Sequence, residues 1–94
     1  IFAANDQNAL GAIQAARDLG ISVPVRLSVV GFDDTPEGAM TAPGLTSIRQ
    51  PLSNIGETAA RLLLRQLTGE KIEPRMHLLE PTLVLRGSTA PPVL

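Results

Sequence analysis

The fold of this chain is decided by two apolar stretches, IFAA at residues 1–4 and LSVVGF at residues 27–32. Both are short and contain residues that favour extended backbone, which predicts two buried strands. Between them, apolar residues recur at helical spacing over residues 6–19, with Asn5 or Asp6 as a candidate N-cap and Gly20 as a natural helix end. A strand, a helix and a second strand joined by short loops indicate a right-handed βαβ unit in a parallel sheet.

The rest of the chain continues this α/β pattern with weaker signals. Residues 33–45 are rich in turn-forming residues and predict a loop, whereas residues 46–49 predict a short extended segment. A second amphipathic helix is expected over residues 53–68, with Ser53 as its N-cap. Its apolar face comprises Ile55, Ala59, Leu62, Leu63 and Leu67. Two further extended pieces are expected within residues 76–86.

The composition excludes several classes of protein. The 94 residues include no cysteine, which excludes disulfides and thiolate metal sites. His77 is the single histidine, so this chain alone cannot form a zinc site with two histidines, and we expect His77 to be structural. There is no Trp or Tyr, and the two Phe residues offer little surface for stacking bases or sugars. No apolar run approaches the roughly 20 residues of a membrane span.

The charge is close to balanced but unevenly distributed. The net charge is −1; residues 1–48 hold five acidic and two basic residues, and residues 49–94 hold six basic and four acidic ones. Neither half has the density of basic residues that nucleic-acid binding requires, so we expect no DNA binding by this chain itself. The chain opens inside an apolar run without an initiator methionine, which predicts a segment of a longer protein.

Polar residues follow each of the predicted strands. Asn5 and Asp6 come after the first strand, Asp33 and Asp34 after the second, and Gln50 ends the third extended segment. Ligands of open parallel sheets bind outside the carboxyl ends of the strands. Amide and carboxylate groups around one cleft suit an uncharged, polyhydroxylated ligand such as a sugar. Asn and Asp in such places are also common helix caps and turn formers, so both interpretations stay open.

Catalytic chemistry finds little support in the residue pattern. There is no glycine-rich phosphate loop, no Gly-x-Ser-x-Gly turn and no Ser/His/Asp set, so we expect no catalytic residue and no cofactor. Adjacent strand residues point to opposite faces, so only one of Asp33 and Asp34 is expected to face a cleft. Asp6 is expected to act as a first-turn residue that favours the helix dipole. A metal site made by Asp33, Asp34 and Thr35 is a minor alternative, and we expect none.

Three segments carry a resemblance to a known family. ANDQNALGA at residues 4–12 resembles the AND-x-x-A-x-G segment of the LacI/GalR family of bacterial transcription regulators. SVVGFDDT at residues 28–35 resembles that family's SVVGFDD strand and loop, and PGLTSIRQP at residues 43–51 is similar to its PPLTTIRQP segment. The three matches keep their order and spacing within residues 1–88, and together they are far more specific than any one of them.

The resemblance implies a fold class and a division of the chain. The class is α/β, a three-layer parallel-sheet sandwich of the type I periplasmic-binding-protein-like kind, present as a C-terminal fragment with its effector cleft between two lobes. Residues 1–89 would form the C-terminal part of the effector-binding and dimerisation domain, and residues 90–94 a tail. Residues 1–49 and about 77–89 would belong to the second lobe, and about 51–76 would pack in the first. The DNA-binding domain would lie outside the chain.

The resemblance also implies roles for individual residues. Three polar residues stand at the family's effector-contacting positions: Asn5, Asp33 and Gln50. Three apolar residues are candidates for a dimer interface: Leu10, Met40 and Leu45. Core packing is an equally open interpretation for Leu10 and Leu45. For Arg49 we expect a structural or interlobe role rather than contact with the effector.

The function implied is regulation of transcription. The chain would be part of a cytoplasmic homodimeric repressor that binds a sugar or related effector, contacts operator DNA through its separate domain and contacts no membrane. A periplasmic sugar-binding protein of an ABC transporter shares the fold, but Asp34 and residues 46–51 favour the regulator. A fragment of an α/β enzyme is disfavoured by the missing phosphate loop and nucleophile. Because the apolar face of residues 53–68 needs cover, we also expect the chain to associate with a second copy.

Overall fold

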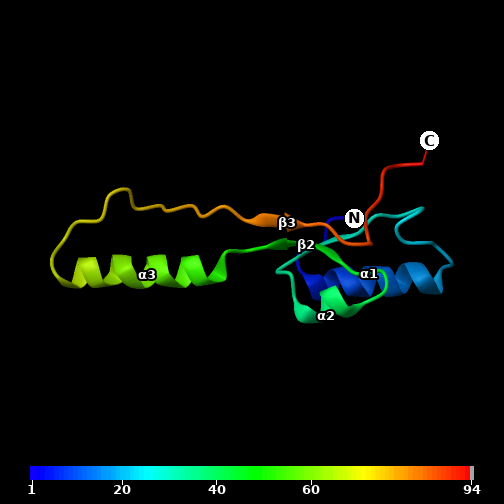
Figure 1. The fold of residues 1–94 in the computed structure, drawn as a ribbon, viewed down its shortest axis with the longest axis horizontal. Helices are drawn as coiled ribbons and strands as arrows, with labels where there is room; N and C mark the ends of the chain where they lie inside the picture. The colour runs from blue at the N-terminus through cyan, green and yellow to red at the C-terminus, as the bar shows by residue number, and fades with distance from the viewer. Residues whose placement is uncertain (94) are drawn as a thin grey trace. The chain divides into compact units, whose positions relative to one another are not determined.

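The computed structural model describes residues 1–93. Its helices and strands, drawn in Figure 1, are α1 (Asp6–Asp18), β1 (Val30–Phe32), α2 (Pro36–Met40), β2 (Thr46–Arg49), α3 (Leu52–Leu67) and β3 (Thr82–Val84). The chain forms two compact units: unit 1 contains Ile1–Arg49 and the chain from Thr82 onward, and unit 2 contains Gln50–Pro81. Leu94, the last residue of the predicted tail, lies outside the described residues.

Unit 1 is built on a three-stranded sheet in the order β1–β2–β3. β1 and β2 are parallel, with Val30 opposite Thr46. A parallel bridge joins Phe2 to Val30, which confirms the βαβ unit predicted for the first 32 residues. The first strand is shorter than predicted, however, because only Phe2 pairs; the second begins at Val30 and not at residue 27.

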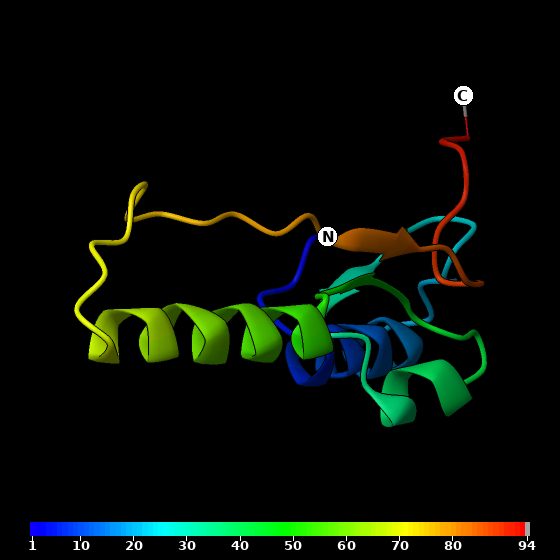
Figure 2. The same ribbon diagram turned by 60° about the vertical axis from the view of Figure 1, so that its left-hand side comes forward.

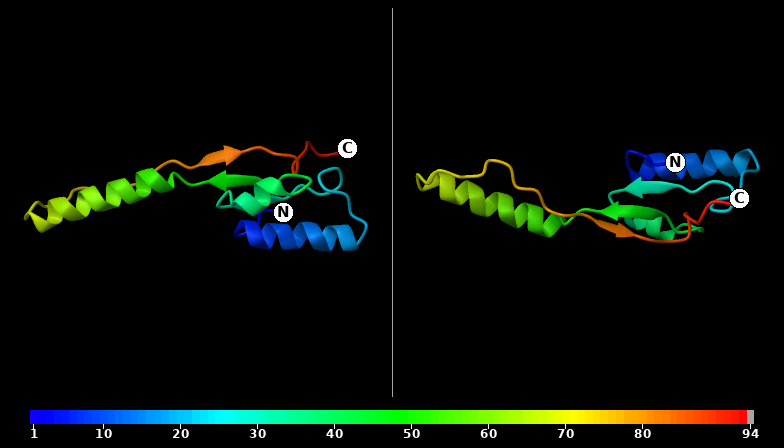
Figure 3. Two further views of the ribbon diagram at one scale, coloured as in Figure 1. Left: turned by 60° about the horizontal axis from the view of Figure 1, so that its bottom comes forward. Right: turned by 90° about the horizontal axis from the view of Figure 1, so that it is seen from above.

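The sheet is mixed: β1 and β2 form the predicted parallel pair, and β3 adds an antiparallel strand that the prediction did not include. β3 pairs antiparallel with β2, with Ser47 opposite Val84. It enters unit 1 after the chain has passed through unit 2, and it runs in the opposite direction along β2. Figure 3 (right) shows the three strands side by side. Residues 76–79, also predicted to be extended, form no strand.

α1 begins and ends as predicted. The Asn5 side-chain oxygen accepts a hydrogen bond from the Asn8 N–H at 2.8 Å, and the Asn5 backbone is extended, as an N-cap requires. Gly20 follows the helix with φ 71°, a left-handed value that glycine adopts without a Cβ clash. Ala9 and Ile13 of α1 are buried in the core of unit 1. Figure 2 shows α1 and α2 on the same side of the strands β2 and β3.

α2 corrects the prediction that residues 33–45 form only a loop. Thr35 is its N-cap, and the Thr35 hydroxyl accepts a hydrogen bond from the Gly38 N–H at 3.3 Å. Pro36 follows at the first helical position, where its missing N–H has no cost. Thr-Pro is therefore a helix-start signal that the turn-rich composition of this segment concealed.

Unit 2 consists mainly of α3. This helix begins at Leu52 after Pro51, with no side-chain cap, so the prediction that Ser53 caps it is wrong. Gly69 follows its end with φ 88°. No residue of α3 is buried, and Ile72 is the only buried residue of the unit. Across residues 1–93, no helix has both the length and the apolar character needed to cross a membrane.

Candidate functional site

Asn5 and Asp33 occupy equivalent places in unit 1. Each lies three residues beyond the paired residues Phe2 and Val30. Because the two paired segments are parallel, both side chains follow their strands at the same carboxyl edge of the sheet. The backbone N–H of Asp33 donates to the Ile48 carbonyl at 2.9 Å, which keeps the end of β1 against β2.

The capping role of Asn5 decides which part of its carboxamide faces away from the helix. Its oxygen accepts from the Asn8 N–H, so the amide nitrogen is the part that the cap does not use. The Asn5 side chain is half-buried. Capping and ligand binding, which the sequence left as alternatives, are therefore chemically compatible at Asn5: it can cap α1 with its oxygen and donate a hydrogen bond with its nitrogen.

Asp33 has an unusual backbone conformation. Its φ is 106°, and that of Asp34 is 52°. Such values are rare for residues with a Cβ and cost of order 1–3 kcal/mol, so surrounding contacts must maintain them. Asp33 is exposed at this turn. An ionised carboxylate in this position is a hydrogen-bond acceptor.

The carboxylate of Asp34 points into unit 1, where it meets two arginines. Its side chain is only 8% exposed; Arg49 Nε donates to Oδ2 at 2.7 Å, and Arg86 Nη2 lies 2.7 Å from Oδ1. Among the described residues Oδ1 accepts no well-directed hydrogen bond, so its contact with Arg86 is a Coulombic pair. Burial raises the pKa of Asp34, but the hydrogen bond from Arg49 and the charges of Arg49 and Arg86 outweigh it and hold the pKa below its ordinary value of 3.8.

Asp6 connects the start of α1 to the turn that follows β1. It is 1% exposed, and its Oδ2 accepts from the Thr35 N–H at 2.6 Å and the Thr35 hydroxyl at 2.9 Å. Its Oδ1 accepts from the Ser47 hydroxyl at 2.7 Å, and that hydroxyl in turn accepts from the Asp34 N–H at 3.0 Å. Asp6 does lie in the first turn of α1, but its main role is this buried network, which fixes the segment with Asn5 relative to the segment with Asp33.

The C-terminal segment completes unit 1 through hydrogen bonds distant in sequence. The Ser88 hydroxyl donates to the Val29 carbonyl at 2.6 Å and accepts from the Thr46 N–H at 2.8 Å. Arg86 Nη1 donates to the Leu45 carbonyl at 2.8 Å. Because Arg86 is fixed by these neighbours, its charge is held close to Asp34.

The remaining predicted site residues lie in different environments. Gln50 directly follows β2 and is the first residue of unit 2. Met40, at the end of α2, is 84% exposed. Leu10 is half-buried and packs against the core of unit 1, whereas Leu45 is fully buried in that core. Leu45 therefore packs inside unit 1, the second of its two interpretations, and presents no surface for a dimer contact.

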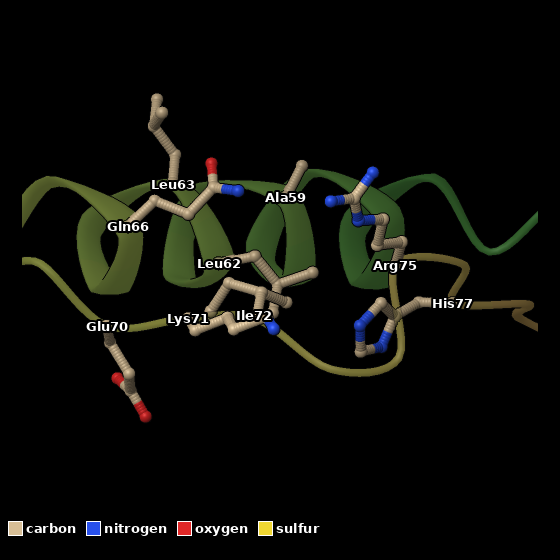
Figure 4. Close-up of a pocket in the computed structure, with 9 residues that line it drawn as sticks. All are labelled: Ala59, Leu62, Leu63, Gln66, Glu70, Lys71, Ile72, Arg75 and His77. Carbon is tan, nitrogen blue, oxygen red and sulfur yellow. The ribbon is translucent and has the colours of Figure 1, made fainter.

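The groove in Figure 4 lies in unit 2 and contains none of the predicted effector residues. It has a volume of about 570 Å³ and runs between α3 and the segment after it, with Leu62, Ile72 and His77 among its lining. Glu70 at its end is already paired: Arg65 donates to it from Nε at 2.9 Å and Nη2 at 2.8 Å. These hydrogen bonds lower the pKa of Glu70. No buried polar side chain of the groove is available to orient a ligand, so its size does not make it the functional site.

The minor alternative for this turn was a metal site made by Asp33, Asp34 and Thr35. Within residues 1–93, no group of three or more acidic or histidine side chains comes together in a way that could hold a metal ion. Asp34, one of the proposed ligands, is instead occupied by its two arginines.

The geometry of unit 1 and its motifs agree with comparisons to known proteins. The sequence profile of the periplasmic binding protein-like domain matches residues 1–89, and the chain belongs to this family. Over 90 residues it is 48% identical to the HTH-type transcriptional regulator MalR of Streptomyces coelicolor, a match that covers 96% of this chain and 26% of that protein. The chain thus spans about a quarter of the length of the curated relatives it matches.

Solved structures give the same result. A complex of the transcriptional regulator CelR with cellobiose matches with a TM-score of 0.84 and 40% identity, over 93% of this chain and 27% of that one. The lac repressor dimer bound to operator and the anti-inducer ONPF matches with a TM-score of 0.86 and 39% identity, over 94% and 30%. The resemblance to LacI-type regulators and the periplasmic-binding-protein-like fold class are thereby confirmed.

Sequence reasoning missed the residues that support the site from within. Asp34, Arg86 and Ser88 act through contacts that span 15 to 59 positions along the chain. A short-range pattern carries no signal for such contacts. The one available hint was the expectation that only one of the adjacent residues Asp33 and Asp34 would face a cleft.

Proposed function

We propose that the chain is the effector-binding and dimerisation part of a LacI/GalR-type transcriptional regulator, a cytoplasmic repressor that responds to a sugar or a related small molecule. The observation that carries this proposal is the equivalent placement of Asn5 and Asp33 at one carboxyl edge of the sheet. Both residues belong to segments that resemble the family's own motifs. Relatives that are transcriptional regulators support the same conclusion.

The chemistry of the two side chains favours a ligand rich in hydroxyl groups. Asn5 can donate from its amide nitrogen, and Asp33 can accept with its carboxylate. A hydroxyl group of the ligand can accept from Asn5 or donate to Asp33, because it is both a donor and an acceptor. Gln50 is the proposed third contact, able to donate and accept through its carboxamide. CelR, whose structure matches 93% of this chain, is solved with cellobiose. This supports a sugar as the effector class.

The proposed assembly is a homodimer that binds operator DNA through a domain outside this chain. Met40 is the strongest candidate for a dimer contact because it is an exposed apolar side chain at the end of α2. Leu10 remains a second candidate. Effector binding would favour one arrangement of the two lobes, and the altered geometry across the dimer would change operator affinity.

The test is a thermal-shift screen of the complete protein against monosaccharides, disaccharides and nucleobases. A specific ligand at 100 times its Kd should stabilise the native protein by about 2.7 kcal/mol. Asp33→Ala and Asn5→Ala should each remove most of the shift given by the best ligand. Asp18→Ala, which removes an exposed carboxylate from the far end of α1, is the matched control and should leave the shift intact. An unchanged shift in Asp33→Ala would refute the assignment of the site.

The two other functional interpretations are less well supported. The curated relatives are helix-turn-helix regulators, which favours regulation over a transporter's sugar-binding protein. They are also not enzymes, and we propose no catalytic role for this chain. A reaction that requires only this chain and is abolished by Asp33→Asn would contradict that proposal.

A further inference from the structure

The turn at Asp33 and Asp34 is maintained in a conformation that it would not adopt alone. Both residues have positive φ, and Asp33 lies at 106°, outside the small left-handed region that Asp visits most readily. Strained backbone persists only where surrounding contacts over-determine it. The question at this turn is which contacts do so.

The side chain of Asp34 provides two of these contacts. Its carboxylate is bound from two directions, by Arg49 at the end of β2 and by Arg86 just after β3, each at 2.7 Å. Its backbone N–H donates to the Ser47 hydroxyl at 3.0 Å. We call Asp34, Arg49 and Arg86 the Asp34 clamp. The clamp fixes the turn to two different strands, so the turn cannot rotate without breaking an ion pair.

Asp34 and its neighbour Asp33 face in different directions. The Asp34 side chain is almost completely buried, whereas Asp33 is exposed. The two residues share the backbone of one turn, so a change in the backbone angles of Asp34 also moves Asp33. If Asp34 leaves its two arginines, the turn can relax toward negative φ and the Asp33 carboxylate changes direction.

We propose that Asp34 is a positioning residue of the effector site: with Arg49 and Arg86 it holds Asp33 in the orientation that binds the ligand. This inference rests on the proposed function, because it takes Asp33 as an effector contact. Arg49 is the last residue of β2 and directly precedes Gln50 in the chain.

The clamp has properties that distinguish it from a surface ion pair. An exposed pair contributes little to stability and is easily screened by salt. Here Arg49 is 57% exposed, but Asp34 is 8% exposed and Arg86 is 21% exposed and fixed by the Leu45 carbonyl. The removal of Asp34's charge therefore leaves two arginines without their partner and releases the turn, which affects geometry as well as stability.

The first experiment compares Asp34→Asn with Val29→Ala in the complete protein. Val29 is a fully buried core residue of unit 1 that lies outside the clamp, so its truncation lowers Tm without touching the turn. If the binding conformation of the turn falls to a tenth of the population, the apparent affinity for the best sugar falls about tenfold. We expect that loss, measured by titration calorimetry well below Tm, in Asp34→Asn and less than about a twofold change in Val29→Ala. Equal losses in the two variants, or none in Asp34→Asn, would overturn the proposal.

Two further variants separate geometry from charge. Arg49→Gln should lose less affinity than Asp34→Asn, because the pair of Arg86 with Asp34 remains, and the double variant should lose little more than Asp34→Asn, since that variant already breaks the contact with Arg49. Arg49→Lys keeps the positive charge and should recover part of the affinity. Additive losses in the double variant would show that Asp34 and Arg49 act independently, which contradicts the clamp.

The last measurement, amide hydrogen exchange, needs no ligand. Amide hydrogen exchange should be faster at Asp33 and Thr35 in Asp34→Asn, while the amides in the middle of α1 keep their protection. Unchanged exchange at the turn would overturn the inference even where sugar binds normally. If the wild-type protein binds no sugar, or if Asp33→Ala binds as well as wild type, the proposed function fails; the exchange measurement still decides whether Asp34 holds the turn.

Discussion

Gly31 lies where a side chain has no room, because Asp6 and Leu45 already fill the space beside its Cα. A Cβ built on Gly31 would overlap Asp6 Oδ1 and would lie 2.9 Å from Leu45 Cδ2. Both neighbours are fully buried, and Asp6 is held by three hydrogen bonds. At the scale of single residues, the glycine of the VGFDD stretch is thus required by close packing against a buried carboxylate and not by backbone conformation.

The crowding at Gly31 and the open space at Gly11 give a matched pair of glycine substitutions. Gly31→Ala should lower the free energy of unfolding by roughly 1–3 kcal/mol, because a well-packed site must shift to admit the methyl group. Gly11→Ala, in the middle of α1 with no atom within 4 Å of the new Cβ, should instead raise it by up to about 1 kcal/mol. Urea denaturation measures both. A Gly31→Ala protein as stable as wild type would contradict the packing described for Asp6 and Leu45.

The ionisation of Asp34 makes the free energy of unfolding depend on pH. Because contact with Arg49 and Arg86 holds its folded pKa below 3.8, folding favours the ionised carboxylate. That stabilisation is fully present above about pH 5 and is lost as the pH falls through 3.8 toward the lower folded pKa. The free energy of unfolding of the wild type should therefore fall more steeply between pH 5 and 3 than that of Asp34→Asn. Parallel curves for the two proteins would show that the ion pairs contribute nothing to stability.

At the scale of elements, the sequence predicted what local chemistry determines. α1 was readable because its cap, its apolar spacing and its terminal glycine all lie within fifteen residues of one another. α2 was not predicted, because its five residues are too few to show a helical periodicity. The direction of β3 could not be read either, since it depends on the path of the chain through unit 2.

The same distinction applies to the candidate site. Asn5 and Asp33 could be proposed because polar residues directly follow apolar strands, and this is a local pattern. The bonds that fix them, from Asp6 to Thr35 and from Asp34 to Arg86, join residues that are far apart in sequence. No periodicity encodes these bonds, so the contact residues were predicted and the residues that position them were not.

The side-chain hydroxyl of Thr35 attaches α2 to the rest of unit 1. Its hydroxyl caps α2 through the Gly38 N–H and also donates to Asp6 Oδ2 at 2.9 Å. Thr35→Ala should lower the free energy of unfolding by about 2 kcal/mol, from the lost cap and the lost bond to a buried carboxylate. Thr35→Ser keeps the hydroxyl and should recover most of that stability. Thr68→Ala, which removes an exposed hydroxyl at the end of α3, is the control and should cost less than about 1 kcal/mol.

At the scale of the whole molecule, unit 1 has a core and unit 2 exposes its apolar residues. The exposed apolar residues of α3 are Leu52, Ile55, Leu63, Leu64 and Leu67, the last of them 73% exposed. A helix with this many exposed apolar side chains is rarely left in contact with water. The 94-residue chain on its own is therefore expected to self-associate through α3.

Sedimentation velocity over a hundredfold range of concentration tests this expectation. The chain should sediment as a concentration-dependent mixture of monomer and larger species, and the double substitution Leu63→Glu with Leu67→Glu should shift it to monomer, because burial of two charges opposes the contact. Leu19→Glu, at the exposed end of α1, is the matched substitution in unit 1 and should leave the association unchanged. A wild-type chain that is monomeric at every concentration would contradict the expectation. Dissociation by Met40→Glu alone would instead place the contact on the predicted dimer surface of unit 1, since only that substitution alters it.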